Sequence, residues 1–374
     1  MSELPHHHTP SGKPRARGIG IAVEGQPGPL NAITDVPGVA VGYTTLIEGQ
    51  GSLDVGKGPV RTGVTAILPR PVDRVQLPVF AGYHSFNGNG ELTGVHYIAE
   101  AGKFALPVTI TNTHSCGLTR DATIRWAVNR FARRFDDDFA LPVAAETYDG
   151  FLNDINGFHV TDAHVFAAID SAAGGPVEEG SVGGGTGMKC FGFKAGSGTA
   201  SRRVPYGGQS YTLGAFVQAN FGFRGDLTIL GRRLGAAFDD VVMKNAHRDF
   251  ALSSIIAVLA TDAPFLSHQL RRIAQRATVA VSRMGGIGRH GSGDLFLAFS
   301  TANTAISGGA GQALLTAAFV PDEDIDPFFE AAAQAVEEAI LNSMIANADM
   351  EGRDGNFVPA IPHDRLRLAL GLRG

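Results

Sequence analysis

The chain has 374 residues, of which 44% are hydrophobic and 18% charged, and its formal net charge is −5. This balance is that of an ordinary globular protein and argues against a disordered chain. A net negative charge with scattered Lys and Arg also argues against a nucleic-acid partner. Only two cysteines occur, Cys116 and Cys190, so no disulfide framework exists and a reducing, cytoplasmic location is favoured.

The first 20 residues are predicted to form a flexible tail. They include the histidine run 6–8 between prolines, and they lack the apolar stretch of a signal peptide. No run in the sequence approaches the roughly 18 apolar residues of a membrane helix, so no membrane partner is expected. We see no linker or repeat after this tail, and residues 21–374 are therefore expected to form a single catalytic domain.

Runs rich in β-branched residues predict the strands. They lie at 64–68, 107–113, 211–220, 254–260 and 295–300. Helical spacing predicts four helices, which span 118–135, follow the N-cap Thr161, follow Pro264, and begin near Pro327. Because the strand runs are apolar throughout, helices should cover the outer face of each sheet, which predicts an α/β fold with four αββα layers.

The glycine-rich segment SVGGGTGMKCFGFKAGSGTASR, at 181–202, raises the question of phosphate binding. A P-loop needs Lys and then Ser or Thr directly after its last glycine, whereas Gly187 is followed by Met188, Lys189 and Cys190. No dinucleotide-binding unit is visible either. The glycines are therefore interpreted as tight structural turns near a site, and no nucleotide cofactor is expected.

His114 and Cys116 in TNTHSCG are two residues apart, as a base and a thiol nucleophile on one strand face would be. The alternative is a small buried cysteine at the end of a strand, without a chemical role. We favour this second interpretation.

A pair of hydroxyls stands directly before the apolar run in LSSIIAVLATDAP, at 252–264. Serine is common where a chain turns into a strand, so Ser253 and Ser254 can be a turn only. The alternative is a nucleophile at the mouth of a buried strand. The surrounding motifs decide between these interpretations.

The serine pair and TDAP turn occur together with VQANFG at 217–222 and GRHGSGDLFLAFSTAN at 288–303. Further matching segments are NAITDVPGVAVGY, GNGELTG, TNTHSCGLTRD, AETYDGFLNDI and the glycine-rich segment. This combination resembles the self-cleaving serine aminopeptidases, which include the L-aminopeptidase/D-amino-acid esterase-amidases and the β-peptidyl aminopeptidases. The likeness extends over most of the chain, and it implies Ntn-hydrolase-like αββα layering, shared with proteins of the ornithine acetyltransferase type.

The resemblance implies a precursor that cuts itself before Ser254, into an α chain of 1–253 and a β chain of 254–374. Spacing to TDAP and to Ser292 favours Ser254 over Ser253 as the nucleophile. The residue before the cut is usually Gly or Asn in this family, and the serine at 253 is a departure that keeps this choice open.

Cutting beside a serine has a chemical purpose. A serine hydroxyl is a weak nucleophile without an adjacent base. When the bond before Ser254 breaks, a free amine appears on the residue that bears the hydroxyl. The pKa of such an amine is about 7.7–8.0, so near neutral pH part of it is uncharged and can accept the hydroxyl proton.

Five further residues take roles by resemblance. Ser292 relays or orients the proton at the nucleophile, and Asp294, where the family often has Glu, holds Ser292 or the amine. Asn220 donates to the oxyanion, Tyr148 lines the same site, and Glu146 pairs with the amino group of the substrate. In the sequence, Ser292 and Asp294 lie in the loop GSGD and share a face if that loop is extended.

The expected function is that of a cytoplasmic aminopeptidase, amidase and esterase that releases N-terminal residues from small peptides, amides or esters through an acyl-enzyme. No metal or organic cofactor is expected. The resemblance further implies a homo-oligomer, a tetramer of αβ units. The alternatives are an acyltransferase like ornithine acetyltransferase, whose nucleophile is Thr rather than Ser, and a binding protein that is never processed.

Overall fold

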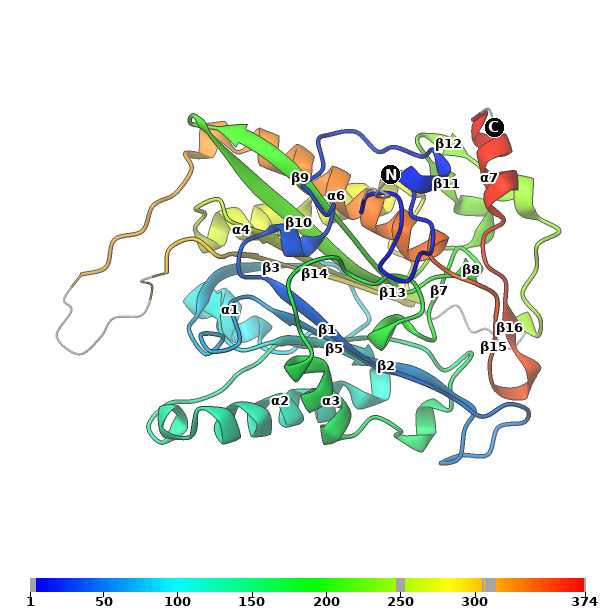
Figure 1. Ribbon diagram of the computed structural model, residues 1–374, viewed down its shortest axis with the longest axis horizontal. Helices are drawn as coiled ribbons and strands as arrows, with labels where there is room; N and C mark the ends of the chain where they lie inside the picture. The colour runs from blue at the N-terminus through cyan, green and yellow to red at the C-terminus, as the bar shows by residue number, and fades with distance from the viewer. Residues whose placement is uncertain (1–4, 247–252, 305, 307–313, 373–374) are drawn as a thin grey trace.

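Two sheets lie face to face between two layers of helices in the computed structural model, which describes residues 5–246, 253–304, 306 and 314–372 (Figure 1). One sheet has four strands in the order β1 (Ala40–Glu48), β2 (Val60–Leu68), β5 (Val108–Asn112), β6 (Ala144–Thr147). The other has six, in the order β4 (Lys103–Phe104), β3 (Val79–Gly88), β14 (Ser292–Ser300), β13 (Ser253–Thr261), β10 (Gln209–Asn220), β9 (Ser197–Tyr206). The predicted αββα sandwich is confirmed.

The helices cover the outer faces of both sheets. The four-stranded sheet packs against α2 (Cys116–Arg130) and α3 (Asp162–Asp170). The six-stranded sheet packs against α4 (Ser267–Gln275) and α6 (Asp326–Ile345), and α6 also contacts α5 (Ala277–Arg283). The remaining elements are α1 (Val95–Ala101), α7 (His363–Leu370), β7 (Lys189–Cys190), β8 (Phe193–Lys194), β11 (Thr228–Ile229), β12 (Arg232–Arg233), β15 (Met350–Glu351) and β16 (Phe357–Val358).

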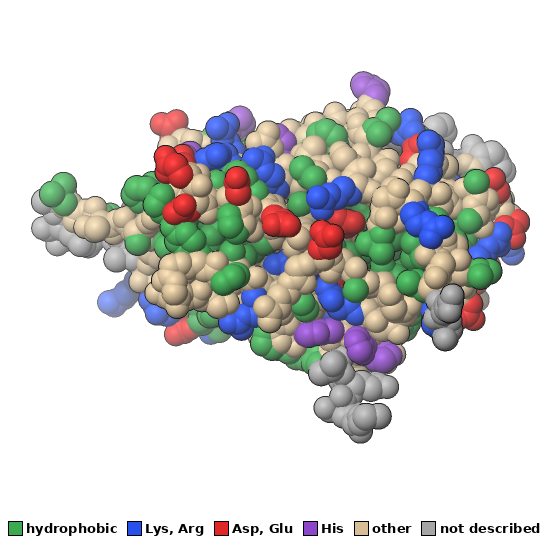
Figure 2. Space-filling model, turned by 90° about the horizontal axis from the view of Figure 1, so that it is seen from above, with side chains coloured by type: hydrophobic (Ala, Val, Ile, Leu, Met, Phe, Trp, Pro, Cys, Tyr) green, Lys and Arg blue, Asp and Glu red, His purple; other side chains and the backbone are tan. Residues whose placement is uncertain are grey.

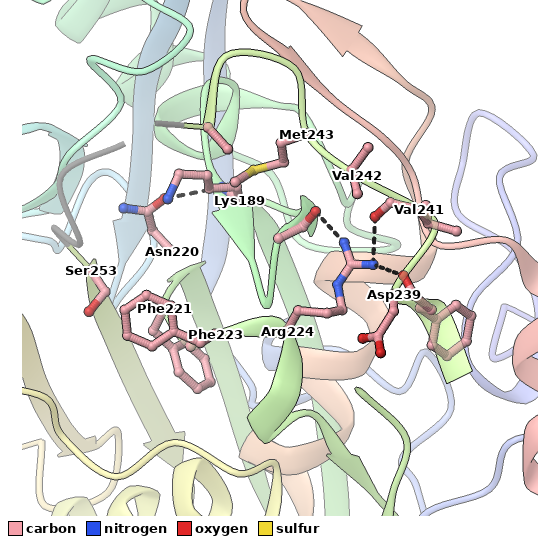
Figure 3. Close-up of a pocket in the computed structure, with 14 residues that line it drawn as sticks. Lys189, Asn220, Phe221, Phe223, Arg224, Asp239, Val241, Val242, Met243 and Ser253 are labelled. Carbon is pink, nitrogen blue, oxygen red and sulfur yellow. Dashed lines mark hydrogen bonds between the residues drawn. The ribbon is translucent and has the colours of Figure 1, made fainter. Parts of the chain in front are cut away.

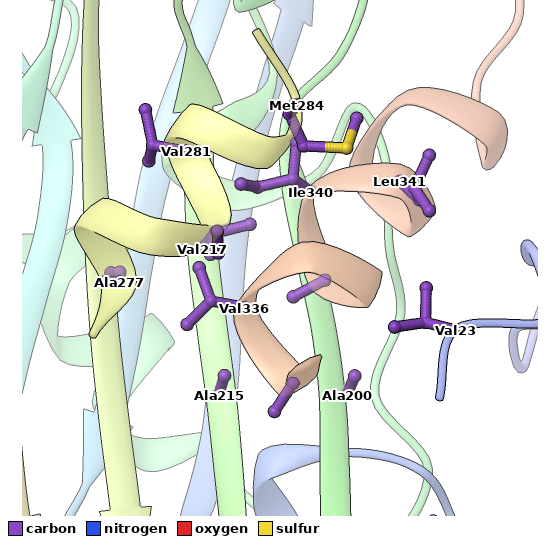
Figure 4. Close-up of a cluster of buried hydrophobic side chains, with 14 of the residues drawn as sticks. Val23, Ala200, Ala215, Val217, Ala277, Val281, Met284, Val336, Ile340 and Leu341 are labelled. Carbon is purple, nitrogen blue, oxygen red and sulfur yellow. The ribbon is translucent and has the colours of Figure 1, made fainter. Parts of the chain in front are cut away.

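Alternation along the central strands separates the cores. In β13, Ile256 and Val258 point between the sheets, whereas Ile255 and Ala257 point toward the helices. Side chains of β9, β10, α5 and α6 fill the helix side (Figure 4). Both faces of β13 are buried from residue 255 to residue 260, and this part of its sequence is apolar, in agreement with the predicted strand at 254–260.

All five predicted strands and all four predicted helices are present, with changed ends. The helix expected over 118–135 stops at Arg130, because Phe131 leaves the helical conformation with φ −123° and ψ 42°. The structure also corrects the strand placement of His114 and Cys116: residues 113–115 form a 3₁₀ turn, and Cys116 begins α2. Helices α1, α5 and α7 were not predicted.

The N-terminal segment corrects another expectation. Residues 5–20 are packed against the sandwich rather than forming a flexible tail. The Arg15 side chain is 3% exposed and its Nε lies 2.6 Å from Glu179 Oε2, and Arg17 Nε lies 2.7 Å from Glu338 Oε1. Glu338 also accepts from Arg202 Nη2 at 2.6 Å. These ion pairs join the segment to Glu179 and to α6, and Glu338 connects it further to Arg202 of β9.

Acidic and basic side chains alternate over the face seen from above, with apolar and neutral surface between them (Figure 2). Among the ion pairs of the described residues are Arg272 with Asp322 and Arg283 with Glu337. None of the described helices combines the length and the apolar character needed to cross a bilayer.

Candidate active site

The pairing of three strands places the serine at the end of the six-stranded sheet. Ser254 lies opposite Asn220 in the antiparallel pair β10–β13 and opposite Gly293 in the parallel pair β13–β14. Its side chain has the same parity as Ile256 and Val258, and it therefore faces the space between the sheets. Only 5% of Ser254 is exposed.

The Ser254 hydroxyl lies against the peptide bond that precedes it. Its Oγ donates to the carbonyl oxygen of Ser253 at 2.6 Å and accepts from the backbone N–H of Gly293 at 3.3 Å. Glycine is required at 293, because a Cβ there would lie 2.6 Å from the carbonyl oxygen of Asn89. The close approach of these backbones lets a main-chain donor reach the hydroxyl.

A cavity of about 250 Å³ opens in front of Ser254, and it has an acidic wall. Glu146, from the end of β6, accepts from the backbone N–H of Glu91 at 2.9 Å and from the hydroxyl of Thr113. Burial raises the pKa of Glu146, while these two hydrogen bonds oppose that shift. The lining residues are Asn89, Gly90, Glu91, Thr113, Glu146, Tyr148, Ser253, Ser254 and Gly291.

Asn220 is fixed on both sides of its amide. Its Nδ2 donates to the carbonyl oxygen of Tyr148 at 3.0 Å, and its Oδ1 accepts from the backbone N–H of Lys189 at 3.1 Å (Figure 3). A side-chain amide has two N–H donors, so the bond to Tyr148 leaves the second for another oxygen. The structure thus brings Asn220, Tyr148, Glu146 and Ser254 to one end of the sandwich.

Ser292 and Asp294 share a face, but they are not in a loop: they begin strand β14. The Ser292 hydroxyl donates to Asp294 Oδ1 at 2.6 Å. Burial raises the pKa of Asp294 to about 6, opposed by the Ser292 hydroxyl and the backbone N–H of Ile255. The carboxylate therefore lies beside the main chain of β13.

The structure shows no hydrogen bond between Ser292 and Ser254, the contact expected from the sequence. Asp294 has the parity of Phe296, which faces the helices, whereas Ser254 faces the other sheet. Among the described residues, the hydrogen bonds of Ser254 Oγ go to Ser253 and Gly293. Opposite parity on neighbouring strands explains the separation, which spacing along the sequence could not reveal.

A second cavity, of about 330 Å³, lies on the other side of Asn220 and Ser253 (Figure 3). Phe221, Phe223, Val241, Val242 and Met243 make its walls largely apolar. The Arg224 guanidinium supports these walls, because it donates to the carbonyl oxygens of Phe238 and Val241 at 2.9 and 2.8 Å. An apolar portion of a ligand would fit here.

The cysteines are placed as buried side chains. Burial raises the pKa of Cys116 above its usual range and the pKa of Cys190 to about 12, so both thiols stay protonated. The ring of His114 stacks on Phe158 with centroids 6.1 Å apart. The described residues contain no group of three His, Cys, Asp or Glu side chains arranged to hold a metal ion.

The glycine-rich segment serves packing. Gly184 lies against β5 and β10, where a Cβ would be 2.5 Å from the carbonyl oxygen of Ile110 and 2.3 Å from Gln218 Oε1. Residues missed in the sequence are Thr113, which binds Glu146, and the backbone donors of Glu91, Lys189 and Gly293. All four lie in the segments that carry the family resemblance, which was the available signal.

Replacing Asp294 should stabilise the fold in a pH-dependent way. A carboxyl group whose pKa rises from 3.8 to about 6 on folding favours the native state only while protonated. The resulting penalty is absent below pH 4, grows up to pH 6, and reaches about 2–3 kcal/mol above it. Asp294→Asn in a Ser254→Ala background should therefore raise the free energy of unfolding at pH 8 and leave it unchanged at pH 4, as measured by denaturant titration.

The matched control is Asp73→Asn, at an exposed carboxylate. It should change the unfolding free energy little at either pH. A gain for Asp294→Asn of equal size at pH 4 and pH 8 would contradict the assignment of the penalty to the buried charge.

Comparison with known proteins agrees with this architecture. The sequence model of Peptidase family S58 matches residues 31–358. A β-peptidyl aminopeptidase BapA of Sphingosinicella microcystinivorans is 47% identical over 368 residues, which cover 96% of this chain and 92% of that protein.

Two solved structures are also similar. The L-aminopeptidase D-Ala-esterase/amidase of Ochrobactrum anthropi, described as a prototype of the serine aminopeptidases and a variant of the Ntn-hydrolase fold, has a TM-score of 0.90 and 50% identity, with 96% of this chain and 98% of that one covered. A β-aminopeptidase of Burkholderia sp. has a TM-score of 0.86 and 46% identity over the same shares. The chain therefore belongs to peptidase family S58, and it is a hydrolase of the aminopeptidase type.

Proposed function

We propose that Ser254 is the nucleophile and that the chain cuts itself between Ser253 and Ser254, which gives an α chain of 1–253 and a β chain of 254–374. The observation that supports this assignment is the 2.6 Å contact between the Ser254 hydroxyl and the carbonyl oxygen of the bond to be cut. Ser253 lies at the mouth of both cavities, so the cut would free the space in front of the nucleophile.

In this reaction Ser254 Oγ forms a bond to the carbonyl carbon of Ser253, and the peptide C–N bond breaks. The nitrogen leaves as the amine of Ser254 and takes up the hydroxyl proton. Water then hydrolyses the ester, which frees the carboxylate of Ser253 and the hydroxyl of Ser254. The new amine is the base for later turnovers.

Ser292 and Asp294 act on this amine rather than on the hydroxyl. Asp294 lies at the backbone N–H of Ile255, one residue from the nitrogen that the cut sets free. A carboxylate and a hydroxyl beside that nitrogen hold it in place and stabilise its protonated form. The pair thereby keeps the base next to the nucleophile.

The substrate class follows from the acidic cavity. Glu146 is buried and accepts hydrogen bonds from two neutral donors, and among the described side chains the charge of His114 offsets its burial only in part. An ammonium group of the substrate supplies the missing charge. With the amine at Glu146, the carbonyl group lies at Ser254 and its oxygen accepts from Asn220. Small peptides, amino-acid amides and esters with a free amine meet this requirement.

The leaving group occupies the apolar cavity beside Phe221 and Val242, which Asn220 also lines (Figure 3). Acylation releases this group and leaves the acyl half on Ser254, and water completes the turnover. Similar proteins are named for activity on β-peptides and on L-amino-acid substrates. The activity of this chain should therefore be compared on amides of α-amino acids and of β-amino acids.

We also propose a cytoplasmic homo-oligomer of αβ units, with a tetramer as the expected state. Two free, buried cysteines fit a reducing compartment. A segment that extends away from the sandwich exposes apolar side chains, with Leu314 87% and Phe319 54% exposed (Figure 1). Apolar side chains so exposed favour contact with another subunit.

The variant Ser254→Ala should remain a single chain near 39.1 kDa and have no peptidase activity, because neither ester formation nor the amine base is possible. Denaturing electrophoresis and an amide hydrolysis assay measure this. Ser253→Ala is the matched control and should still be cut. If Ser254→Ala were cut and Ser253→Ala were not, the nucleophile would be Ser253.

The variant Glu146→Gln should lose the preference for a free amine. Loss of one charge-assisted pair should lower kcat/KM for an amino-acid amide roughly 10- to 100-fold. The slow hydrolysis of the N-acetylated amide should not change. Glu100→Gln is the control, since this exposed carboxylate on α1 lies outside the residues that line the cavity. Equal losses on both substrates would contradict the amine-anchor role.

Leu314→Asp combined with Phe319→Asp should lower the molar mass in solution, because charges in a subunit contact are costly. Light scattering of the wild-type protein should give a multiple of 39.1 kDa. Leu368→Asp, at a site that is 79% exposed on α7, is the control and should leave the mass unchanged. A wild-type monomer would disprove the assembly.

A further inference from the structure

Lys194 is a buried amine that the proposed reaction does not use. It ends strand β8, it has no exposed surface, and its Nζ donates to the carbonyl oxygens of Met188 and Ala195 at 2.8 and 2.6 Å. Within the part of the chain that the structure describes, no carboxylate forms an ion pair with it. Burial lowers its pKa well below the usual value. Burying an ammonium group without a carboxylate partner lowers the stability of the fold, so a functional reason for this placement is expected.

Its hydrogen bond reaches one end of a peptide group whose other end binds Asn220. The carbonyl oxygen of Met188 accepts from Lys194, and the N–H of the same peptide bond, at Lys189, donates to Asn220 Oδ1 at 3.1 Å. Asn220 Nδ2 continues the series to the carbonyl oxygen of Tyr148 at 3.0 Å. Lys194, the Met188–Lys189 peptide and the Asn220 amide thus form one chain of donors and acceptors that ends beside Ser254.

In this series of hydrogen bonds, from Lys194 to Asn220, every bond runs from donor to acceptor in the same direction. A donor at the Met188 oxygen draws electron density from the peptide nitrogen and makes the Lys189 N–H a stronger donor. That N–H acts in the same way on the Asn220 amide and strengthens its two Nδ2 donors. Successive hydrogen bonds in a buried chain strengthen one another by perhaps 10–30% each. The Lys189 N–H also fixes which end of the Asn220 amide faces Ser254, because only Oδ1 can accept from it.

We propose that Lys194 is a positioning residue of the oxyanion hole, which orients and polarises the Asn220 amide through the peptide bond between Met188 and Lys189. This inference rests on the proposed role of Asn220 as oxyanion donor. It assigns a part in the reaction to a residue that contacts neither the substrate nor the nucleophile. A purely structural lysine would hold the β7–β8 hairpin and influence stability alone.

A double-mutant cycle separates these two roles. Asn220→Ala should lower kcat roughly 10²- to 10³-fold, as the removal of an oxyanion donor does. Lys194→Met, which keeps the length of the side chain and removes the donors, should lower kcat roughly tenfold with KM changed less than about twofold. In the Asn220→Ala background, Lys194→Met should have almost no further effect on kcat. All rates are divided by the fraction of chains that have been cut.

Two further variants separate an effect on kcat from an effect on folding. Lys194→Gln keeps two N–H donors without the charge, and its kcat should lie between those of the wild type and Lys194→Met. The matched control is Gln269→Met: Gln269 is equally buried and donates to Val320 O and Asp322 Oδ1 at 2.7 and 2.8 Å, away from the site. It should lower the melting temperature but not kcat.

A spectroscopic readout does not depend on activity. With ¹⁵N-lysine labelling, the amide proton of Lys189 should shift upfield in Lys194→Met, because its hydrogen bond to Asn220 weakens. A Lys189→Arg variant assigns this resonance by its loss. The measurement can be made on the uncut Ser254→Ala chain, so it remains possible for a variant that fails to process.

The outcomes distinguish the two proposals. If Asn220→Ala lowers kcat and Lys194→Met lowers it by the same factor in both backgrounds, the coupling is absent and the role of Lys194 is disproved while the oxyanion role of Asn220 stands. An effect of Lys194→Met on KM or melting temperature alone also disproves it. If Asn220→Ala leaves kcat unchanged, both proposals fail.

Discussion

The parallel pairing of β13 with β14 is the constraint on which the site depends. It sets Ser254 opposite Gly293, while the antiparallel partner β10 sets Asn220 opposite the same serine. A shift of one residue in this register would turn the serine toward the helices and every apolar side chain of β13 to the wrong core. The packing of Ile256 and Val258 between the sheets therefore also fixes the position of Ser254, the proposed nucleophile.

The site collects buried acids whose charges the protein itself leaves poorly compensated. Burial raises the pKa values of Glu146, Asp149 and Asp294, to about 7 for Asp149 and about 6 for Asp294. Asp149 Oδ2 also has no hydrogen-bond partner among the described atoms. Such an arrangement lowers stability in the absence of ligand, and in the proposed substrate complex an amine would offset part of this loss at Glu146. Glu179 and Glu338 are buried acids too, but each forms an ion pair with an arginine of the N-terminal segment, Arg15 and Arg17 respectively.

The glycine-rich segment, 181–202, contributes both to the packing of the sheets and to the support of Asn220. Its glycines allow Gly184 to lie against the inner strands, and the same segment carries the peptide bond that joins Lys194 to Asn220. A composition typical of anion-binding loops is used here for close backbone packing and for the support of one side-chain amide. The hydrogen-bond network around Asn220 thus extends to residues that do not line the two cavities.

The sequence by itself determined the layers and the family. Apolar runs such as 255–260 predict strands that are buried on both faces, and helices on the outer faces then fit an αββα sandwich, which the family resemblance also implies. The family resemblance placed Ser254, Asn220, Tyr148 and Glu146 among the candidates, and of these Ser254 and Asn220 also lie at the ends of predicted strands.

Tertiary structure alone decided which of these side chains meet. The face on which Ser292 and Asp294 lie depends on their parity relative to Ser254, and that relation exists only once β13 and β14 pair. The same holds for the path of residues 5–20 across α6 and for the contact between Lys194 and the Met188 carbonyl. Spacing along a chain defines the face of one strand, but the relative position of two strands is set by hydrogen bonds between residues far apart in sequence.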